Sequence, residues 1–175
     1  MKNNIALIGF MATGKTAVGK ALSKRLNKQF IELDREIEVK TRKSIPEIFR
    51  NEGEIRFREL EIEVIKEIAG KNNIVIACGG GVILNWINIV RLQKESEIVC
   101  LTASPETILK RALADGGTRP LLNVPDREAE MKKLLSFRQP FYERAAEITI
   151  DTSGLNIDGV VAKIIEKLEN ESLNK

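Results

Sequence analysis

The stretch GFMATGKT, residues 9–16, decides the fold of this chain because it fits the phosphate-binding pattern G-x-x-x-x-G-K-[ST]. An apolar run at Asn4–Ile8 predicts a buried strand before it, and a helical pattern at Ala17–Leu26 follows it. Backbone N–H groups of such a loop, together with the start of the helix, attract phosphate oxygens. Lys15 is placed to reach the β- and γ-phosphates, and Thr16 to ligate Mg²⁺. ATP or GTP is therefore the first ligand to test, and the alternative is a glycine-rich turn that only joins strand to helix.

The bulk composition predicts one globular domain with inserted segments. The chain has 175 residues, of which 43% are hydrophobic and 30% charged, which argues against disorder and against a membrane protein. No apolar run is long enough to span a bilayer, and the first residues lead into a core strand, so we expect a cytoplasmic location. The net charge of +3 is spread among acidic residues, so we expect no nucleic-acid partner.

The absence of histidine excludes several chemistries. A Ser-His-Asp triad, a Cys-His pair and a His-ligated metal cannot form within this sequence. A general base must then be Asp, Glu, Lys, Tyr or Cys. The two cysteines, Cys78 and Cys100, lie in apolar runs and are predicted to pack in the core instead of forming a disulfide or a metal site. Phosphoryl transfer suits such a chain, because its catalysis is mostly positioning and charge stabilisation.

Short β-branched runs alternate with helical patterns, which predicts a parallel sheet covered on both faces. The runs are Ile5–Ile8, Phe30–Leu33, Ile74–Cys78, Ile98–Thr102 and Ile148–Ile150. Two segments depart from this alternation. Asp34 to about Leu60 predicts a small helical insertion, with a capping box at Ser44 and Glu47 and a break at Gly53. Residues 112–126 predict a loop, placed to serve as a lid over the phosphates.

Polar residues that follow the apolar runs are the first candidates for a site, because open parallel sheets bind ligands at the carboxyl ends of their strands. Asp34 follows the second run, and it is either a helix N-cap or the acceptor of a proton from an attacking hydroxyl. Gly79–Gly81 follow the third run, and they form either a plain turn or a bare backbone that a ligand approaches.

Three arginines are further candidates. Arg58 lies four residues from Glu54 and three from Glu61, which by itself predicts an ordinary solvated salt-bridge face. Arg119, in the predicted lid, and Arg138 each carry a planar guanidinium that suits a carboxylate or a phosphate. The residues alone leave each of these alternatives open.

Taken together, the motifs resemble the shikimate kinase family in order and spacing over nearly the whole chain. Besides the phosphate loop, the motifs are Leu33-Asp34-x-x-Ile37-Glu38, Ile48-Phe49, Gly53-Glu54-x-x-Phe57-Arg58-x-x-Glu61, Gly79-Gly80-Gly81, Arg119-Pro120-Leu121-Leu122 and Arg138-x-Pro140-x-Tyr142. The resemblance implies a P-loop NTPase fold: a nucleoside-monophosphate-kinase-like α/β/α sandwich with a five-stranded parallel sheet, a substrate-binding insertion and a lid. It also implies transfer of the ATP γ-phosphate to the 3-hydroxyl of shikimate, in the pathway to chorismate and the aromatic amino acids.

The resemblance further implies roles for individual residues. Asp34, Lys15 and Arg119 would be catalytic, with Asp34 accepting the proton and Arg119 coming from the lid. The ATP site would comprise Ala12, Thr13, Gly14, Lys15, Thr16, Ala17, Arg119 and, near the adenine, Arg111. The shikimate site would comprise Asp34, Arg58, Gly79, Gly80, Gly81 and Arg138, with Glu61 orienting Arg58. Thr16 and Glu32 would hold Mg²⁺, and we expect a monomer.

Two positions depart from the family pattern. Ala12 stands where glycine is common, so the loop must accommodate a Cβ, and Glu32 replaces a common aspartate near the Mg²⁺. These departures motivate one alternative, a non-catalytic nucleotide-binding module. A second alternative is a related kinase acting on gluconate or a nucleotide. Arg58, Arg138 and the glycine run Gly79–Gly81 argue against it.

Overall fold

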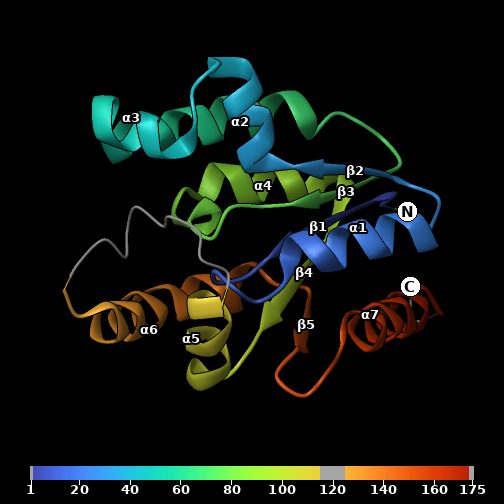
Figure 1. Ribbon diagram of the computed structural model, residues 1–175. Coiled ribbons are helices and arrows are strands. Elements are labelled where there is room, and N and C mark those ends of the chain that lie inside the picture. Colours follow the sequence, from blue (N-terminus) through green and yellow to red (C-terminus); the bar gives the residue numbers. More distant parts are fainter. Residues whose placement is uncertain (1, 115–124, 174–175) are drawn as a thin grey trace.

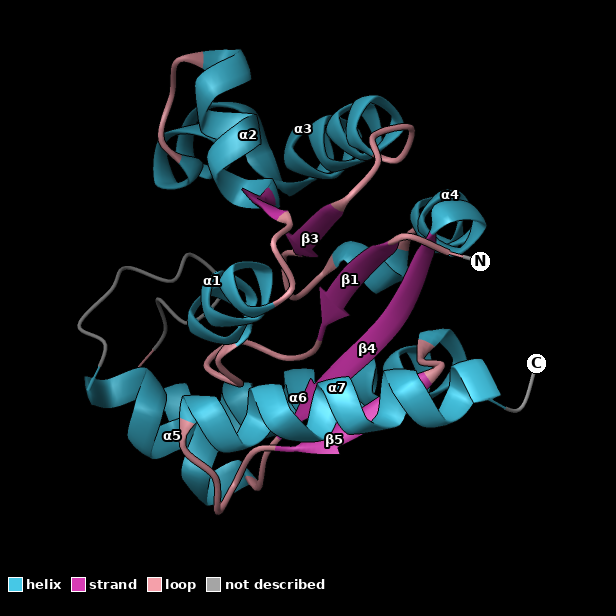
Figure 2. Ribbon diagram, turned by 90° about the vertical axis from the view of Figure 1, so that its right-hand side faces the viewer, coloured by secondary structure: helices cyan, strands magenta, loops and turns pink. Residues whose placement is uncertain are grey.

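A parallel sheet forms the core of the molecule, and Figure 2 shows its strands side by side. The computed structural model describes residues 2–114 and 125–173. Within these residues, five strands stand in the order β2-β3-β1-β4-β5, and every neighbouring pair is parallel. The strands are β1 (Asn4–Ile8), β2 (Gln29–Glu32), β3 (Ile74–Ala77), β4 (Ser96–Thr102) and β5 (Ile148–Asp151). Each predicted apolar run is thus a strand, with ends shifted by one or two residues.

Helices cover both faces of the sheet (Figure 1). On one face, α1 (Lys15–Arg25) and α7 (Ile157–Leu173) pack side by side against the strands. The opposite face packs against α3 (Ile45–Ile68), α4 (Trp86–Glu95) and α6 (Arg127–Ala145). The other helical segments are α2 (Leu33–Thr41), the short 3₁₀ turn η1 (Val82–Leu84) and α5 (Pro105–Ala114).

The central strand shows why the strands are apolar throughout. In β1, Ile5 and Leu7 join the core on the α1 and α7 side, whereas Ala6 and Ile8 join the core on the other side. Because successive side chains of a strand point to opposite faces, a strand covered on both sides needs an unbroken apolar run. Cys78 and Cys100 are free and buried in the second of these cores, so the prediction that they pack is confirmed.

The segment after β2 contains the predicted helices. Ser44 caps α3, its side chain accepting from the Glu47 N–H while Glu47 bonds back to the Ser44 N–H, so the capping box is confirmed. At Gly53 the backbone leaves the helical range, with φ 83° and ψ 173°. This conformation is essentially restricted to glycine. Helix α3 therefore has two limbs, Ile45–Glu52 and Glu54–Ile68, joined at a kink.

Two boundaries differ from the predictions. Leu33, assigned to the second strand, is the first residue of α2. The predicted loop at 112–126 is wrong for its first three residues, because α5 continues through Ala114. An Ala-Leu-Ala ending has high helix propensity, and the glycine pair that suggested a loop begins only at Gly116. Residues 115–124, which include Arg119 and most of the predicted lid, lie outside the described residues. In the part that is described, no helix is both long and apolar enough to cross a membrane.

Candidate active site

The phosphate loop leaves the carboxyl end of β1 and passes into α1 through three unusual backbone conformations. Gly9 has φ 141°, and a Cβ there would lie 2.2 Å from the Leu101 carbonyl oxygen, so this position requires glycine. Gly14, with φ 95°, is the N-cap of α1. Ala12 also has positive φ, at 60°, so the loop accommodates its Cβ in a left-handed conformation that costs about 1–2 kcal/mol.

Side chains of the loop turn inward. The buried Thr13 hydroxyl donates to the Phe10 carbonyl at 2.8 Å. The Lys15 ammonium folds back over the loop and donates to the carbonyls of Gly9 (2.8 Å) and Phe10 (2.7 Å). A positive charge is therefore held at the mouth of the loop, beside the start of α1, where phosphate oxygens bind favourably.

Thr16 and Glu32 place two side-chain oxygens next to each other at the edge of the loop. The Thr16 hydroxyl donates to Glu32 Oε1 at 2.6 Å, which joins the first turn of α1 to the end of β2. No group of three or more Asp, Glu, His or Cys side chains that could hold a metal occurs among residues 2–114 and 125–173. Mg²⁺ bound with a nucleotide needs only one or two protein oxygens, because phosphates and waters complete its shell. The pair therefore fits Mg²⁺ carried by a nucleotide.

Two cavities meet above the carboxyl ends of the strands. The first, of about 570 Å³, is lined by the phosphate loop, Lys15, Thr16 and Arg111. The second, of about 420 Å³, is lined by both limbs of α3, with Arg58 and Arg138 among its walls. Both cavities share a wall of five residues: Met11, Glu32, Asp34, Gly79 and Gly80. A group bound in one cavity therefore faces a group bound in the other across Asp34.

Asp34 lies in the first turn of α2, and the N-cap position belongs to Glu32, so the N-cap alternative for Asp34 is wrong. Its Oδ1 is buried and has no hydrogen-bond partner among the described residues. Burial raises the pKa of this carboxyl group, Lys15 opposes that effect, and Glu32 adds to it. A raised pKa makes this carboxylate a better proton acceptor than an exposed aspartate.

Arg58 is held in place by two glutamates, a glycine and an aromatic ring. Its Nη1 donates to Glu61 Oε2 at 2.5 Å, and its Nε and Nη2 donate to Glu54 Oε1 at 3.2 and 2.9 Å. The guanidinium lies against Gly81, where a Cβ would come within 2.3 Å of Nη1. Its Cζ lies 5.0 Å from the centre of the Phe57 ring. These contacts leave N–H groups of the guanidinium available to a ligand in the second cavity.

Arg138 supplies the second cation from the opposite wall. It is only 3% exposed, and its Nε has no hydrogen-bond partner among the residues described. Its Cζ lies 5.9 Å from the centre of the Phe10 ring. A buried guanidinium with an unused donor is a strong site for an anion, because the charge has been desolvated already.

Comparisons with known proteins agree with this geometry. A family model described as shikimate kinase matches residues 11–169. A shikimate kinase from Thermodesulfovibrio yellowstonii is 48% identical over 172 residues, 98% of each chain. The chain belongs to the shikimate kinase family. Among solved structures, the shikimate kinase from Acinetobacter baumannii in complex with shikimate has a TM-score of 0.94 at 36% identity, covering 99% of this chain and 96% of that one. The one from Aquifex aeolicus has a TM-score of 0.83 at 34% identity, covering 98% and 99%.

The predicted P-loop NTPase fold with a five-stranded parallel sheet is thereby confirmed for this shikimate kinase family member. The structure brings nearly all the predicted site residues to the two cavities. Thr13 lines a third cavity of about 470 Å³, which shares Gly14 and Arg111 with the first.

The glycine run has a physical reason that the sequence did not reveal. A Cβ at Gly79 would lie 3.0 Å from both Asp34 Oδ1 and Glu61 Oε1, and one at Gly81 would overlap Arg58. Only Gly80 meets ordinary contacts, and its carbonyl accepts from the Tyr142 hydroxyl. Two of the three glycines thus leave room for side chains of the site, and a Cβ at either position would displace them.

One contact of the site was missed entirely. Arg111 donates from Nη1 to Thr152 Oγ1 and from Nη2 to the Thr152 carbonyl, each at 2.9 Å. Thr152 follows β5, so the rule that polar residues after strands merit attention would have found it.

Proposed function

We propose that this member of the shikimate kinase family transfers the γ-phosphate of ATP to the 3-hydroxyl of shikimate, giving shikimate 3-phosphate and ADP. The observation that carries the proposal is the meeting of two cavities at Asp34, one lined by the phosphate loop and the other by Arg58 and Arg138. A ring acid with several hydroxyls needs cations for its carboxylate and an acceptor for its hydroxyl proton. The second cavity offers both.

The nucleotide occupies the first cavity. Lys15 and the backbone of residues 12–17 hold the phosphates, and Arg111, fixed by Thr152, lies on the adenine side. Arg119, which the family resemblance assigns to the phosphates, lies outside the described residues, and its role stays a prediction from the sequence. Thr16 and Glu32 would hold Mg²⁺, which would neutralise negative charge on the phosphates.

Shikimate occupies the second cavity, with its carboxylate toward Arg58 and Arg138 and its hydroxyls toward Asp34. The 3-hydroxyl oxygen forms the new bond to the γ-phosphorus, while the bond from that phosphorus to the β,γ-bridging oxygen breaks and ADP leaves. Asp34 takes the hydroxyl proton. Its raised pKa supports this role, because it makes the carboxylate a stronger base. A monomeric state and a cytoplasmic location stay predictions from the sequence.

The deciding experiment measures ADP release from Mg·ATP by the purified chain with shikimate, gluconate or nucleoside monophosphates as acceptors. We expect release that depends on shikimate and is reduced by orders of magnitude in Lys15→Met. Turnover with gluconate or a nucleotide instead would assign a different substrate. ATP binding without turnover on every acceptor would support the non-catalytic module and direct attention to Ala12 and Glu32.

A further inference from the structure

Glu61 is a buried carboxyl group that the proposed transfer step does not use. Its side chain is 0% exposed, although it belongs to a helix whose neighbouring glutamates face solvent. Oε2 accepts from Arg58 Nη1 at 2.5 Å. Oε1 has no hydrogen-bond partner among the described residues. A buried carboxylate oxygen without a donor is unfavourable, because nothing replaces the water it has lost.

A second buried carboxylate oxygen, from Asp34, lies near the same glycine as Glu61 Oε1. Asp34 Oδ1, on α2, is also buried without a partner, and a Cβ at Gly79 would lie 3.0 Å from it and 3.0 Å from Glu61 Oε1. Two bare acceptors from different helices therefore converge on the backbone of Gly79. One proton at this point would remove a negative charge and supply a donor.

The charges that face Glu61 come from every element around it. Arg58 on α3 and Arg138 on α6 favour its ionised form, and Asp34 on α2 disfavours it. The Cys78 thiol, which follows β3, is kept neutral by burial, which raises its pKa to about 12. Glu54, half exposed on α3, shares the Arg58 guanidinium with Glu61, so the two guanidinium groups already face carboxylates before an anionic ligand enters. The carboxylate of a ligand adds a further negative charge to the same two cations.

We propose that Glu61 takes up a proton from solvent when a carboxylate ligand binds at Arg58 and Arg138, so that substrate binding is coupled to pH. The inference rests on the proposed function, because it takes shikimate as that ligand. The proton adds to Oε1, facing Gly79 and Asp34, while Oε2 continues to accept from Arg58 and keeps the guanidinium in position. Glu61 is thus a positioning residue, and it does not touch the reacting atoms.

The ligand-free protein is poised for this change. Burial, opposed by Arg58, raises the pKa of Glu61 to about 7, and the arriving anion raises that pKa further because it offsets the guanidinium charges. Below this pKa, Glu61 is already protonated, and the binding of shikimate takes up no proton. Above it, each binding event must bring in a proton, so Kd for shikimate increases by up to about tenfold per pH unit until the pKa of the bound form is reached.

The test is titration calorimetry of shikimate into the full chain at about pH 7.5, in phosphate and in Tris buffer. These buffers differ widely in ionisation enthalpy, so proton uptake makes the binding enthalpy depend on the buffer. We expect uptake of part of a proton by the wild type and a Kd that increases above pH 7. In Glu61→Gln the uptake should vanish and Kd should change little between about pH 6 and 8.5.

A matched control is Glu54→Gln, which removes the exposed partner of the same guanidinium and should keep the uptake. A second control is Asp34→Asn. Equal enthalpies in both buffers for the wild type, or uptake that persists in Glu61→Gln, would overturn the inference. Proton uptake that is lost in Asp34→Asn but retained in Glu61→Gln would also overturn it.

If Glu61→Gln does not fold, infrared difference spectra of the wild type provide the test. Shikimate binding must then generate the carbonyl stretch of a protonated carboxyl group, and its absence overturns the inference. Absence of any shikimate binding would instead refute the proposed function.

Discussion

Two groups of charged residues on α3 have the same composition and opposite surroundings. Arg56 pairs with Glu59, and Arg58 pairs with Glu61, both at i,i+3 spacing. Residues two apart on a helix point to different sides. The Arg58 pair accordingly faces the second cavity, with Glu61 fully buried, whereas Arg56 is 39% exposed on the surface of α3. Sequence spacing is equal, and burial alone separates the two pairs.

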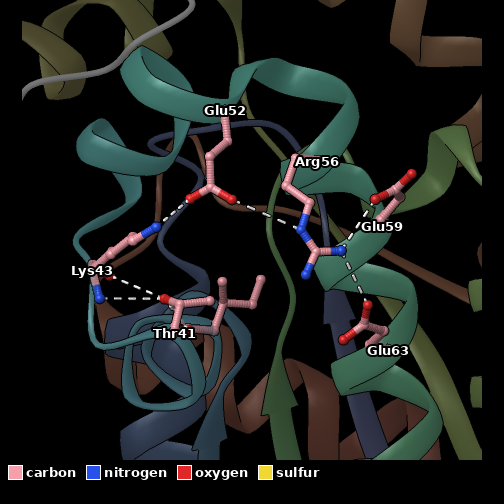
Figure 3. Close-up of polar contacts among 7 residues, drawn as sticks. Thr41, Lys43, Glu52, Arg56, Glu59 and Glu63 are labelled. Carbon is pink, nitrogen blue, oxygen red and sulfur yellow. Dashed lines mark hydrogen bonds and ion pairs between the residues drawn. The ribbon is translucent and has the colours of Figure 1, made fainter.

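The exposed group is an extended network, and Figure 3 shows Glu52 between Lys43 and Arg56. Arg56 Nη1 reaches Glu59 at 3.1 Å and Glu63 at 3.2 Å. The hydrogen bond from Arg56 lowers the pKa of Glu63. In the buried pair, desolvation acts the other way and raises the pKa of Glu61 to about 7. Exposure to solvent therefore determines whether a carboxylate on this helix is an ordinary surface charge or a group whose pKa lies near neutrality.

The largest effect should come from Asp34→Asn, which keeps the shape of a buried side chain and removes its capacity to take a proton. We expect turnover to fall by about 10²–10⁴-fold. Stability should stay equal or increase, because the variant no longer buries a carboxylate oxygen without a partner. Steady-state kinetics and thermal unfolding of the same preparations test both halves. Turnover within tenfold of the wild type would contradict the assignment of Asp34 as proton acceptor.

Arg58→Ala should have the next largest effect, because it separates the buried pair. The KM for shikimate should increase strongly, and unfolding in urea should show a loss of about 3 kcal/mol, since Glu61 is left without its cation. The stability loss should be smaller at pH 6 than at pH 8, because a neutral Glu61 does not need a cation beside it. A pH-independent loss would show that packing against Phe57, not charge, is what the arginine contributes.

Gly53→Ala tests the kink that separates the two limbs of α3. Its φ of 83° and ψ of 173° are restricted to glycine, and a Cβ would meet no atom within 4 Å, so the effect is purely one of backbone strain. We expect a loss of about 1–3 kcal/mol. The KM for shikimate should also increase, because Phe49 on the first limb and Arg58 on the second line the same cavity. Gly70→Ala is the matched control: a Cβ there also meets open space, its φ is not positive, and we expect no loss. Equal losses in both variants would rule out strain at the kink.

The sequence predicted features that depend on local pattern. The phosphate loop, the five strands and the capping box at Ser44 each follow from residues close together in the chain, and each is confirmed. A local pattern also marked the break at Gly53, because glycine within a helical run signals a special backbone conformation.

Features that depend on burial could not be predicted in this way. Arg58 and Glu61 have the spacing of a surface pair, and only the packing of α3 against Gly79–Gly81 shows that they lie inside. The glycine run suggested close approach of a ligand, but Gly79 and Gly81 meet side chains from α2 and α3. Contacts between segments this far apart in the chain are visible only in the folded structure. The family resemblance predicted these residues for the site, and the structure shows which side chains they contact.

The smallest effect should come from Arg56→Ala, at the centre of the exposed network in Figure 3. Exposed ion pairs gain little in water and are screened by salt, so we expect Tm to fall by no more than about 2 °C. The difference from wild type should shrink further in about 0.5 M NaCl. The KM for shikimate and kcat should be unchanged, because Arg56 lines neither cavity. A loss as large as that of Arg58→Ala would show that the network braces the two limbs of α3 across Gly53, where Glu52 and Arg56 approach to 3.9 Å. In that case exposure would not separate the two groups of charges, and the position of Arg58 in the site would depend on both.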